Sequence, residues 1–301
     1  MRVFLTGATG FVGSNLLRRL LRNGHLVRAL VRRRGVLAGA ESGSLEEVEG
    51  DILSPNLAIA GCHAVINLVG IIYEHGHQTF DAVHHLGTRN LINAAQKNGV
   101  QRFVQMSALG ARPGNATEYH TSKFAAEEEV RNSGVPWVVL RPSLIFGPGS
   151  AFLRQMVGIM RAAPLFRPVA GTGKYRFRPI HVDDVADCFV ASLTNAEANG
   201  KTIDLVGAEE VTLNEITDEI ASCLNLRKTA VHIPMPLMKI AASVFSILPV
   251  KSPVTSVQLR MLEEGSTADP GPMKKIFGIE PIGFRAGLRR DLCKAQENQV
   301  L

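Results

Sequence analysis

Short apolar runs recur along the first two hundred residues, separated by longer segments with helical spacing of apolar positions. Runs of four to seven apolar residues are typical of strands buried in a parallel sheet. They occur at residues 2–5, 26–31, 64–70, 102–107, 137–140 and 202–206. Helical spacing is clearest at residues 80–98 and 119–132. Because strands alternate with helices, we expect βαβ units and an α/β fold built on a doubly wound parallel sheet.

The first predicted strand runs into a glycine-rich turn, Thr6-Gly7-Ala8-Thr9-Gly10-Phe11-Val12-Gly13, which an amphipathic helix follows. Gly7 lets the chain leave the strand, Gly10 lets backbone N–H groups approach a phosphate, and Gly13 lets the helix pack closely. This arrangement is the fingerprint of a Rossmann loop that holds a dinucleotide pyrophosphate at a helix N-terminus. We therefore expect the cofactor to be bound by Gly7, Thr9, Gly10, Phe11, Val12 and Gly13.

The pattern becomes less regular after Pro142. Residues 164–174 are turn-like, whereas residues 178–185 begin another strand-to-helix unit and residues 213–224 predict a helix. At 301 residues the chain is long for one domain and short for two large ones. We expect a dinucleotide-binding domain of residues 1–142, which also takes in about 178–207, and a smaller α+β substrate or partner lobe of residues 143–177 and 208–301.

Residues 235–248 form a strongly apolar segment bounded by prolines. At about 14 residues the segment is too short to span a bilayer, which takes roughly 20. A core helix of the lobe is the expected interpretation. The alternative is peripheral contact with a membrane surface or a membrane complex.

Positive charge is concentrated around the glycine turn. Residues 1–40 contain eight arginines and no Asp or Glu, although the whole chain has a net charge of only +6. The second strand ends at Arg32 and Arg33, where an acidic residue would bind the ribose of NAD(H) and basic residues accommodate the 2′-phosphate of NADP(H). Because no carboxylate precedes Glu41, NADP(H) is favoured over NAD(H). A nucleic-acid partner is not expected, since no recognised module is present.

The four cysteines are scattered and include no C-x-x-C pair: Cys62, Cys188, Cys223 and Cys293. This spacing is expected of reduced thiols rather than of a disulfide or zinc framework. No His or carboxylate set has metal-ligand spacing, so we expect no metal. The chain begins directly at a strand, which leaves no room for a signal peptide, and we expect a cytoplasmic location.

Tyr119 and Lys123 are the clearest candidates for chemistry. They are four residues apart on a predicted helix, so they share a face with Cβ atoms roughly 6 Å apart. A nearby ammonium stabilises a phenolate, and such a tyrosine exchanges a proton with a carbonyl or alcohol oxygen while hydride moves to or from a nicotinamide. We expect Tyr119 to be the acid/base, Lys123 its partner and ribose anchor, and a small carbonyl or alcohol the substrate.

Several motifs occur in an order that resembles the extended short-chain dehydrogenase/reductases. They are TGATGFVG, Gly50-Asp51-Ile52, Tyr119 with Lys123, Arg141-Pro142-Ser143 before Phe146-Gly147-Pro148, and His181-Val182-Asp183-Asp184-Val185. The chain looks closest to the atypical branch that includes the 39 kDa subunit of complex I and NmrA-like proteins. The resemblance implies an NAD(P)-dependent oxidoreductase of the epimerase/dehydratase type. Further expected cofactor contacts are Asp51, Ile52, Leu68, Val69, Gly70, Pro142 and Ile145.

Two positions depart from that family pattern. His84 occupies the place of an Asn, and Ala108 that of the catalytic hydroxyl, with Ser107 one residue earlier as a candidate to orient a carbonyl. A hydrogen-bonded structural role is expected for His84 and its neighbour His85, and the alternative is proton transfer or contact with a ligand. Two hypotheses follow: an NADP(H)-dependent carbonyl/alcohol oxidoreductase, or a catalytically weak, cofactor-bound structural, assembly or redox-sensor protein that contacts a membrane complex.

Overall fold

The computed structural model describes residues 1–37, 43–115, 117–163, 165–247 and 254–293. Glu41, Pro164 and Leu248, which entered the expectations above, lie outside the described residues. The chain divides into two compact units. The first comprises Met1–Pro142, Asp183–Leu205 and Gly271–Ile279, and the second comprises Ser143–Val182, Val206–Pro270 and Glu280–Leu301.

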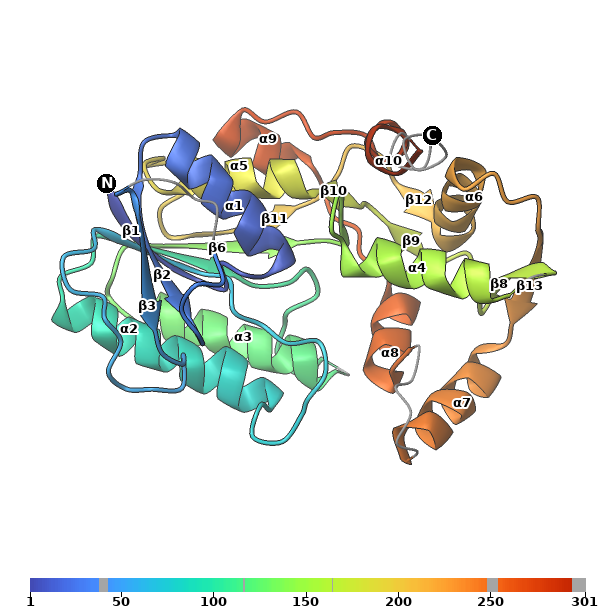
Figure 1. Cartoon of the computed structure of the whole chain (residues 1–301), viewed down its shortest axis with the longest axis horizontal. Coiled ribbons are helices and arrows are strands. Elements are labelled where there is room, and N and C mark those ends of the chain that lie inside the picture. The colour runs from blue at the N-terminus through green and yellow to red at the C-terminus, as the bar shows by residue number, and fades with distance from the viewer. Residues whose placement is uncertain (38–42, 116, 164, 248–253, 294–301) are drawn as a thin grey trace. The chain divides into compact units, whose positions relative to one another are not determined.

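A seven-stranded sheet forms the centre of the first unit (Figure 1). Its strands are all parallel and lie in the order β3-β2-β1-β4-β5-β6-β11. Their bounds are β1 (Arg2–Thr6), β2 (Leu26–Val31), β3 (Leu45–Glu49), β4 (Ala64–Asn67), β5 (Arg102–Met106), β6 (Trp137–Pro142) and β11 (Lys201–Leu205). The expected doubly wound α/β fold is thereby confirmed.

Helices cover both faces of this sheet, with α2 and α3 on one face and α1 and α5 on the other (Figure 1). The helix expected at residues 80–98 begins as a π-helical turn, Asp81–Leu86, and only then becomes α-helical. The bounds are α1 (Phe11–Arg22), α2 (Gly87–Lys97), α3 (Glu118–Arg131), α5 (Val182–Ser192) and α9 (Gly271–Phe277).

The order of the strands reverses beside the glycine turn. The chain moves outward from β1 to β2 and β3 and then returns to β4 on the other side of β1. The carboxyl ends of neighbouring parallel strands meet at such a reversal, which is where open α/β sheets bind ligands. Phe4, Leu5, Val65 and Ile66 of β1 and β4 are completely buried, so this edge of the sheet rests on a packed core.

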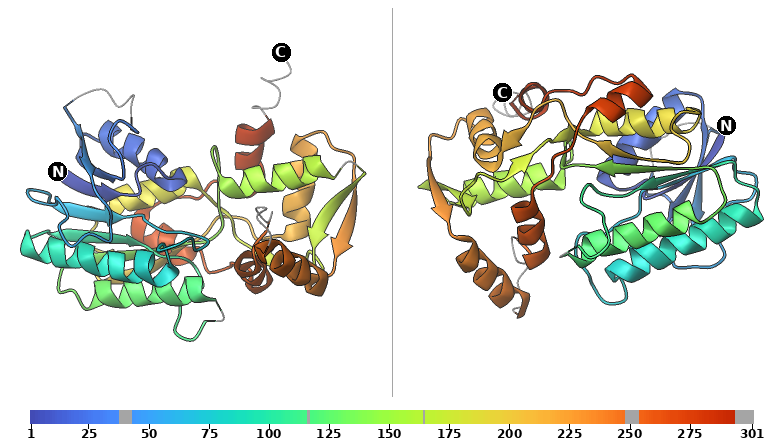
Figure 2. Two further views of the ribbon diagram at one scale, coloured as in Figure 1. Left: turned by 60° about the horizontal axis from the view of Figure 1, so that its bottom comes forward. Right: turned by 180° about the vertical axis from the view of Figure 1, so that it is seen from behind.

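Three two-stranded sheets and several helices form the described part of the second unit, of which Figure 2 gives further views. Its strands are β7 (Ile145–Phe146), β8 (Phe166–Ala170), β9 (Arg176–Phe177), β10 (Ile180–His181), β12 (Val211–Thr212) and β13 (Thr229–Ile233). Its helical elements are α4 (Ala151–Ala162), α6 (Leu213–Cys223), α7 (Met235–Ile247), α8 (Ser256–Glu264), α10 (Phe284–Leu288) and η2 (Arg289–Cys293). Phe146, Ile216, Ile220 and Phe284 lie in its core.

The expectation of turn-like structure at residues 164–174 is wrong over β8. This strand pairs in parallel with β13. Since β13 lies far along the chain, the pairing leaves no local signal, and a pattern read along the chain detects only the turns around it.

The expectation of four reduced cysteines is also wrong. Cys223 and Cys293 form a disulfide across 70 positions of sequence, while Cys62 and Cys188 are buried free thiols. Cys223 ends α6 and Cys293 ends η2, and these two elements pack together in the core of the second unit. Tertiary packing, rather than sequence spacing, brings the two thiols together.

The apolar helix α7 has one buried and one exposed side. Met235 and Ala242 pack with Leu259 of α8, but Leu237 and Ile240 are 58% and 61% exposed. The interpretation as a core helix therefore holds for one side only. Within the described ranges, none of the helices combines the length and the apolar character needed to cross a membrane.

Candidate active site

The glycine turn after β1 has the geometry of a phosphate-binding loop. Gly7 has a φ of +72°, and a Cβ added at Gly13 would lie 2.0 Å from the Gly7 carbonyl oxygen. No side chain caps the N-terminus of α1 at Gly10, and no acidic residue lies in its first turn. Thr9 and Gly10 are exposed. Backbone donors and the helix dipole thus face outward without a competing anion, and the loop fits a dinucleotide pyrophosphate.

A buried polar network holds the carboxyl ends of β1 and β4 together. Thr6 Oγ1 donates to Asn67 Oδ1 at 2.7 Å, and Asn67 Nδ2 donates to Gln105 Oε1 on β5 at 3.0 Å. The Leu68 amide donates to Thr6 Oγ1 and the Val69 amide to Asn67 Oδ1. The backbone at Leu68 and Val69, two of the predicted cofactor contacts, is thereby fixed. Sequence reasoning missed this network, although a polar residue ending an apolar strand is a local sign of it.

Arg32 and Arg33 lie exposed directly after β2. Neither makes a hydrogen bond or ion pair to the residues that the structure describes. The carboxylate of Glu47 on β3 accepts hydrogen bonds from the loop after β2. Its Oε1 accepts from the Leu37 amide at 2.7 Å, and its other oxygen accepts from the Gly35 amide. The two guanidinium groups are therefore not neutralised by that carboxylate.

The remaining predicted cofactor contacts differ in their surroundings. Asp51 is exposed and its Oδ1 accepts from the Leu53 amide at 2.9 Å, whereas Ile52 is buried in the core. Pro142 ends β6 in the first unit, but Ile145 belongs to β7 of the second unit.

Helix α3 carries both Tyr119 and Lys123 and is anchored at two points. The side chain of Thr117 caps its N-terminus. Near its middle, Glu127 accepts two hydrogen bonds from the Arg141 guanidinium of β6, at 2.7 and 2.6 Å. A bidentate charged pair fixes orientation as well as distance, so the helix face with Tyr119 and Lys123 has a defined position over the sheet.

Lys123 is 3% exposed and its Nζ lies at the carboxyl ends of β4 and β5. The ammonium is 3.5 Å from the Val69 carbonyl oxygen and 3.3 Å from that of Met106. A Cβ added at Gly70 would lie 2.8 Å from Lys123 Nζ, so glycine at this position leaves the lysine its space. Burial lowers the pKa of Lys123 to about 8, against the opposing effect of Glu127.

Tyr119 lies in the first turn of α3 and is partly buried. Burial raises the pKa of Tyr119 to about 12, so its hydroxyl is protonated near neutral pH. Desolvation is the cause of this shift, so the stabilisation of the phenolate by Lys123 that the sequence led us to expect does not lower the pKa of Tyr119 in the protein alone.

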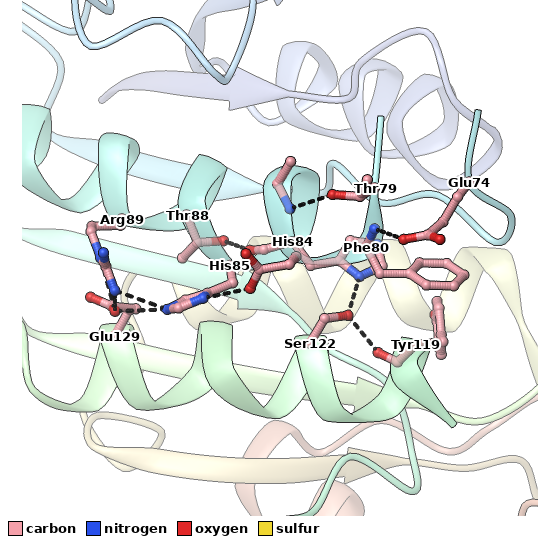
Figure 3. A network of polar contacts seen from close by, with 12 residues as sticks. Glu74, Thr79, Phe80, His84, His85, Thr88, Arg89, Tyr119, Ser122 and Glu129 are labelled. Carbon is pink, nitrogen blue, oxygen red and sulfur yellow. Dashed lines mark hydrogen bonds and ion pairs between the residues drawn. The ribbon is translucent and has the colours of Figure 1, made fainter. Parts of the chain in front are cut away.

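Both histidines of the π-helical turn are hydrogen-bonded, in agreement with the structural role expected of them. His85 lies between Asp81 and Glu129 at 2.9 and 3.0 Å. His84 is buried, and its ring meets the Tyr119 ring edge-on at a centroid distance of 5.4 Å (Figure 3). Sequence reasoning did not place His84 beside Tyr119; its departure from the family pattern is the signal that pointed to this position.

Ser107 is 1% exposed, and its Oγ has no hydrogen-bond partner within the described residues. A buried hydroxyl without a partner is unfavourable unless another group completes its bonding. Its neighbour Ala108 is 8% exposed. Among the described residues the Ser107 hydroxyl thus has no acceptor, and it lies next to the carboxyl end of β5.

A family model matches most of this unit and continues into the second. The model described as the NAD dependent epimerase/dehydratase family matches residues 3–206. The chain belongs to this family. The match covers the glycine turn, the strand ends around Asn67 and the helix that carries Tyr119 and Lys123, so the expected resemblance is confirmed.

Two relatives are similar over most of the chain. A subunit of Arabidopsis thaliana, NADH dehydrogenase (ubiquinone) 1 alpha subcomplex subunit 9, mitochondrial, is 29% identical over 272 residues, which cover 86% of this chain and 67% of the relative. Ceramide reductase of Caulobacter vibrioides is 30% identical over 237 residues, covering 78% of this chain and 74% of the relative.

Solved structures support the same fold. The structure of UDP-glucuronic acid 4-epimerase from Bacillus cereus in complex with NAD has a TM-score of 0.77 and 18% identity, and the match covers 99% of each chain. At this level of identity the similarity concerns the fold.

Proposed function

We propose that this family member is an NADP(H)-dependent oxidoreductase that interconverts a carbonyl compound and an alcohol. The observation that carries the proposal is the burial of Lys123 at the ends of β4 and β5, with Tyr119 on the same helix. A buried ammonium is unfavourable, and buried groups with shifted pKa values cluster at functional sites.

The chain's own residues account for cofactor binding in this proposal. Gly7, Gly10 and Gly13 bring backbone N–H groups to the pyrophosphate, and Lys123 holds the ribose hydroxyls next to the nicotinamide. The bound nicotinamide supplies or accepts hydride. The exposed guanidinium groups of Arg32 and Arg33 bind the 2′-phosphate, which favours NADP(H) over NAD(H).

Proton transfer is the task of Tyr119. With a pKa of about 12 its hydroxyl is a proton donor near neutral pH. It donates to the oxygen of a carbonyl, and the ammonium of Lys123 stabilises the phenolate that remains. The buried hydroxyl of Ser107, which has no partner among the described residues, donates a second hydrogen bond to the same carbonyl and orients it.

Replacement of Tyr119 with Phe tests this mechanism. We expect kcat/KM for a carbonyl substrate found by screening with NADPH to fall by about 100-fold or more, because the acid is lost while the phosphate loop is intact. The affinity for NADPH, measured by fluorescence of the bound nucleotide, is expected to be unchanged. Tyr73→Phe, at an exposed tyrosine of the same unit, is the control. Unchanged turnover in Tyr119→Phe would refute the mechanism.

A second candidate function is supported by α7. Its exposed Leu237 and Ile240 offer an apolar surface, and the Arabidopsis relative is named as a subunit of a respiratory complex. In this alternative the chain is a cofactor-bound structural protein that docks on a membrane complex or bilayer. Sedimentation with phosphatidylglycerol vesicles that is lost in Leu237→Ser/Ile240→Ser would support it, whereas sedimentation of neither protein would count against bilayer contact.

A further inference from the structure

His84 uses both nitrogens of its ring although its side chain is almost completely buried, at 1% exposure. His84 Nε2 lies 3.0 Å from the Ile71 amide nitrogen, and Nδ1 lies 2.8 Å from Ser122 Oγ. The Ser122 hydroxyl donates in turn to the backbone carbonyl of Tyr119 at 2.9 Å (Figure 3). The imidazole therefore links the segment after β4 to the first turn of α3.

The partners determine the tautomer of this ring. A backbone amide only donates, so Nε2 accepts from Ile71 and carries no proton. Burial, and after it the charge of Lys123, lower the pKa of His84 to about 2, so the ring is neutral. Its single proton is therefore on Nδ1, which donates to Ser122.

Aromatic packing adds a second connection to Tyr119. Phe80 stacks on the His84 ring at a centroid distance of 5.7 Å, and its ring meets Tyr119 edge-on at 5.9 Å. With the His84–Tyr119 contact, the three rings form a closed cluster. The phenol of Tyr119 is held at its ring as well as through its backbone.

His84 is itself held rigidly by its main chain. It lies in the π-helical turn Asp81–Leu86, a wide turn that is rare and frequent at functional sites. Its carbonyl accepts from Thr88 Oγ1, which in turn accepts from Asn67 Nδ2 at the end of β4. The main chain and both ring nitrogens of His84 are thus hydrogen-bonded, so a shift of His84 toward a displaced Tyr119 would strain buried hydrogen bonds.

We propose that His84 is a positioning residue that sets the distance between Tyr119 and the Gly70-Ile71 segment. The inference rests on the proposed function, in which Tyr119 must reach a carbonyl next to a nicotinamide held by Lys123. Both Lys123 Nζ and His84 Nε2 approach Gly70, at 2.8 and 3.4 Å from the position of an added Cβ. The histidine links that strand end to Tyr119 by one acceptor and one donor that act at the same time.

Amide substitutions separate the two hydrogen bonds. In His84→Asn the short side chain retains a donor near Ser122, but its acceptor no longer reaches Ile71. In His84→Gln the longer side chain brings an amide oxygen to the place of Nε2 and keeps that acceptor, but no donor remains at the place of Nδ1. His85→Gln is the matched control, because the neighbouring histidine contacts Asp81 and Glu129 rather than Tyr119.

The kinetic test uses the full chain with NADPH and phenanthrenequinone as the probe carbonyl. We expect His84→Asn to lower kcat by roughly 10- to 100-fold, because a small displacement of a catalytic group has effects of this order. The KM for NADPH is expected to stay within about twofold, since the phosphate loop is untouched. His84→Gln should also lower kcat, because the donor to Ser122 is lost, whereas His85→Gln should keep the wild-type rate.

A spectroscopic test is independent of any substrate. The chain has three tyrosines, so protein labelled at tyrosine Cζ gives three NMR signals, of which Tyr119→Phe identifies one. In the NADP⁺ complex we expect the Tyr119 signal to move in His84→Asn and in His84→Gln and to stay in place in His85→Gln. Nitrogen NMR of the histidine rings is expected to show His84 as the Nδ1–H tautomer at every pH from 5 to 8.

The outcomes distinguish this inference from the proposed function. If Tyr119→Phe abolishes turnover but His84→Asn changes neither kcat nor the Tyr119 signal, only the role of His84 is refuted. If Tyr119→Phe turns over normally, the proposed function fails whatever His84 does. If wild-type protein does not reduce the probe, the NMR signal of Tyr119 tests the role of His84, and a signal that is unchanged in His84→Asn refutes that role. A destabilised His84→Asn that keeps the wild-type Tyr119 signal also refutes the positioning role.

Discussion

Replacing Lys123 with Met is expected to stabilise the cofactor-free protein while removing a proposed functional group. The pKa of Lys123 is lowered from 10.5 to about 8 because the ammonium is buried. This difference corresponds to about 3 kcal/mol of destabilisation near pH 7, where both the folded and the unfolded chain carry the proton. Methionine has a similar length and no charge, so Lys123→Met avoids this penalty.

The pH dependence of the unfolding free energy separates the effect of the Lys123 charge from the effects of packing. Between about pH 8 and pH 10.5 the unfolded chain binds more protons at this lysine than the folded chain, so wild-type stability rises with pH in this window. We expect the advantage of Lys123→Met to shrink from about 3 kcal/mol near pH 7 to about 1 kcal/mol near pH 10. The variant also loses the long contacts to the Val69 and Met106 carbonyls, worth at most about 1 kcal/mol together, but this loss applies at both pH values.

Urea unfolding of cofactor-free protein measures the effect. The single tryptophan, Trp137, lies on β6 and reports on the first unit. Lys97→Met, at an exposed lysine that ends α2, is the control and should show no gain. If the difference in unfolding free energy between Lys123→Met and wild type were the same near pH 7 and near pH 10, the argument from the buried charge would be wrong.

Three further outcomes are expected. Gly13→Ala should abolish NADPH binding in a fluorescence titration, because the added Cβ would lie 2.0 Å from the Gly7 carbonyl oxygen. An affinity within twofold of wild type would contradict this expectation. Arg32→Ser/Arg33→Ser should weaken the binding of NADPH by roughly tenfold or more and leave the binding of NADH unchanged. The ratio of the two dissociation constants measures this effect. Arg22→Ser, at the end of α1, is the control. Cys223→Ser should lower the free energy of unfolding by roughly 4 kcal/mol, because the disulfide closes a loop across 70 positions of sequence. Urea unfolding without reductant measures this change. Four titratable thiols in denatured wild-type protein would show that the disulfide is absent.

Features that depend on neighbouring residues followed from the sequence alone. The inner strands of the sheet are short apolar runs because they are buried on both faces, and β4 with Ala64, Val65 and Ile66 is a clear case. The glycine turn is equally local, since the φ of Gly7 and the space at Gly13 are set within a few bonds. Tyr119 and Lys123 share a helix face for the same reason, because helical geometry relates i to i+4.

Only the tertiary structure brought together groups that are distant in the chain. Thr6 and Asn67 meet because β1 and β4 are neighbours in the sheet, and His84 meets Ser122 because the π-helical turn and α3 pack on the same face. Cys223 and Cys293 pair through the packing of α6 against η2, against the expectation from their spacing. The π-helical turn itself escaped prediction, since its apolar spacing differs little from that of an α-helix. The physical reason is common to all: local backbone rules act over a few residues, whereas these contacts depend on which surfaces the folded core brings face to face.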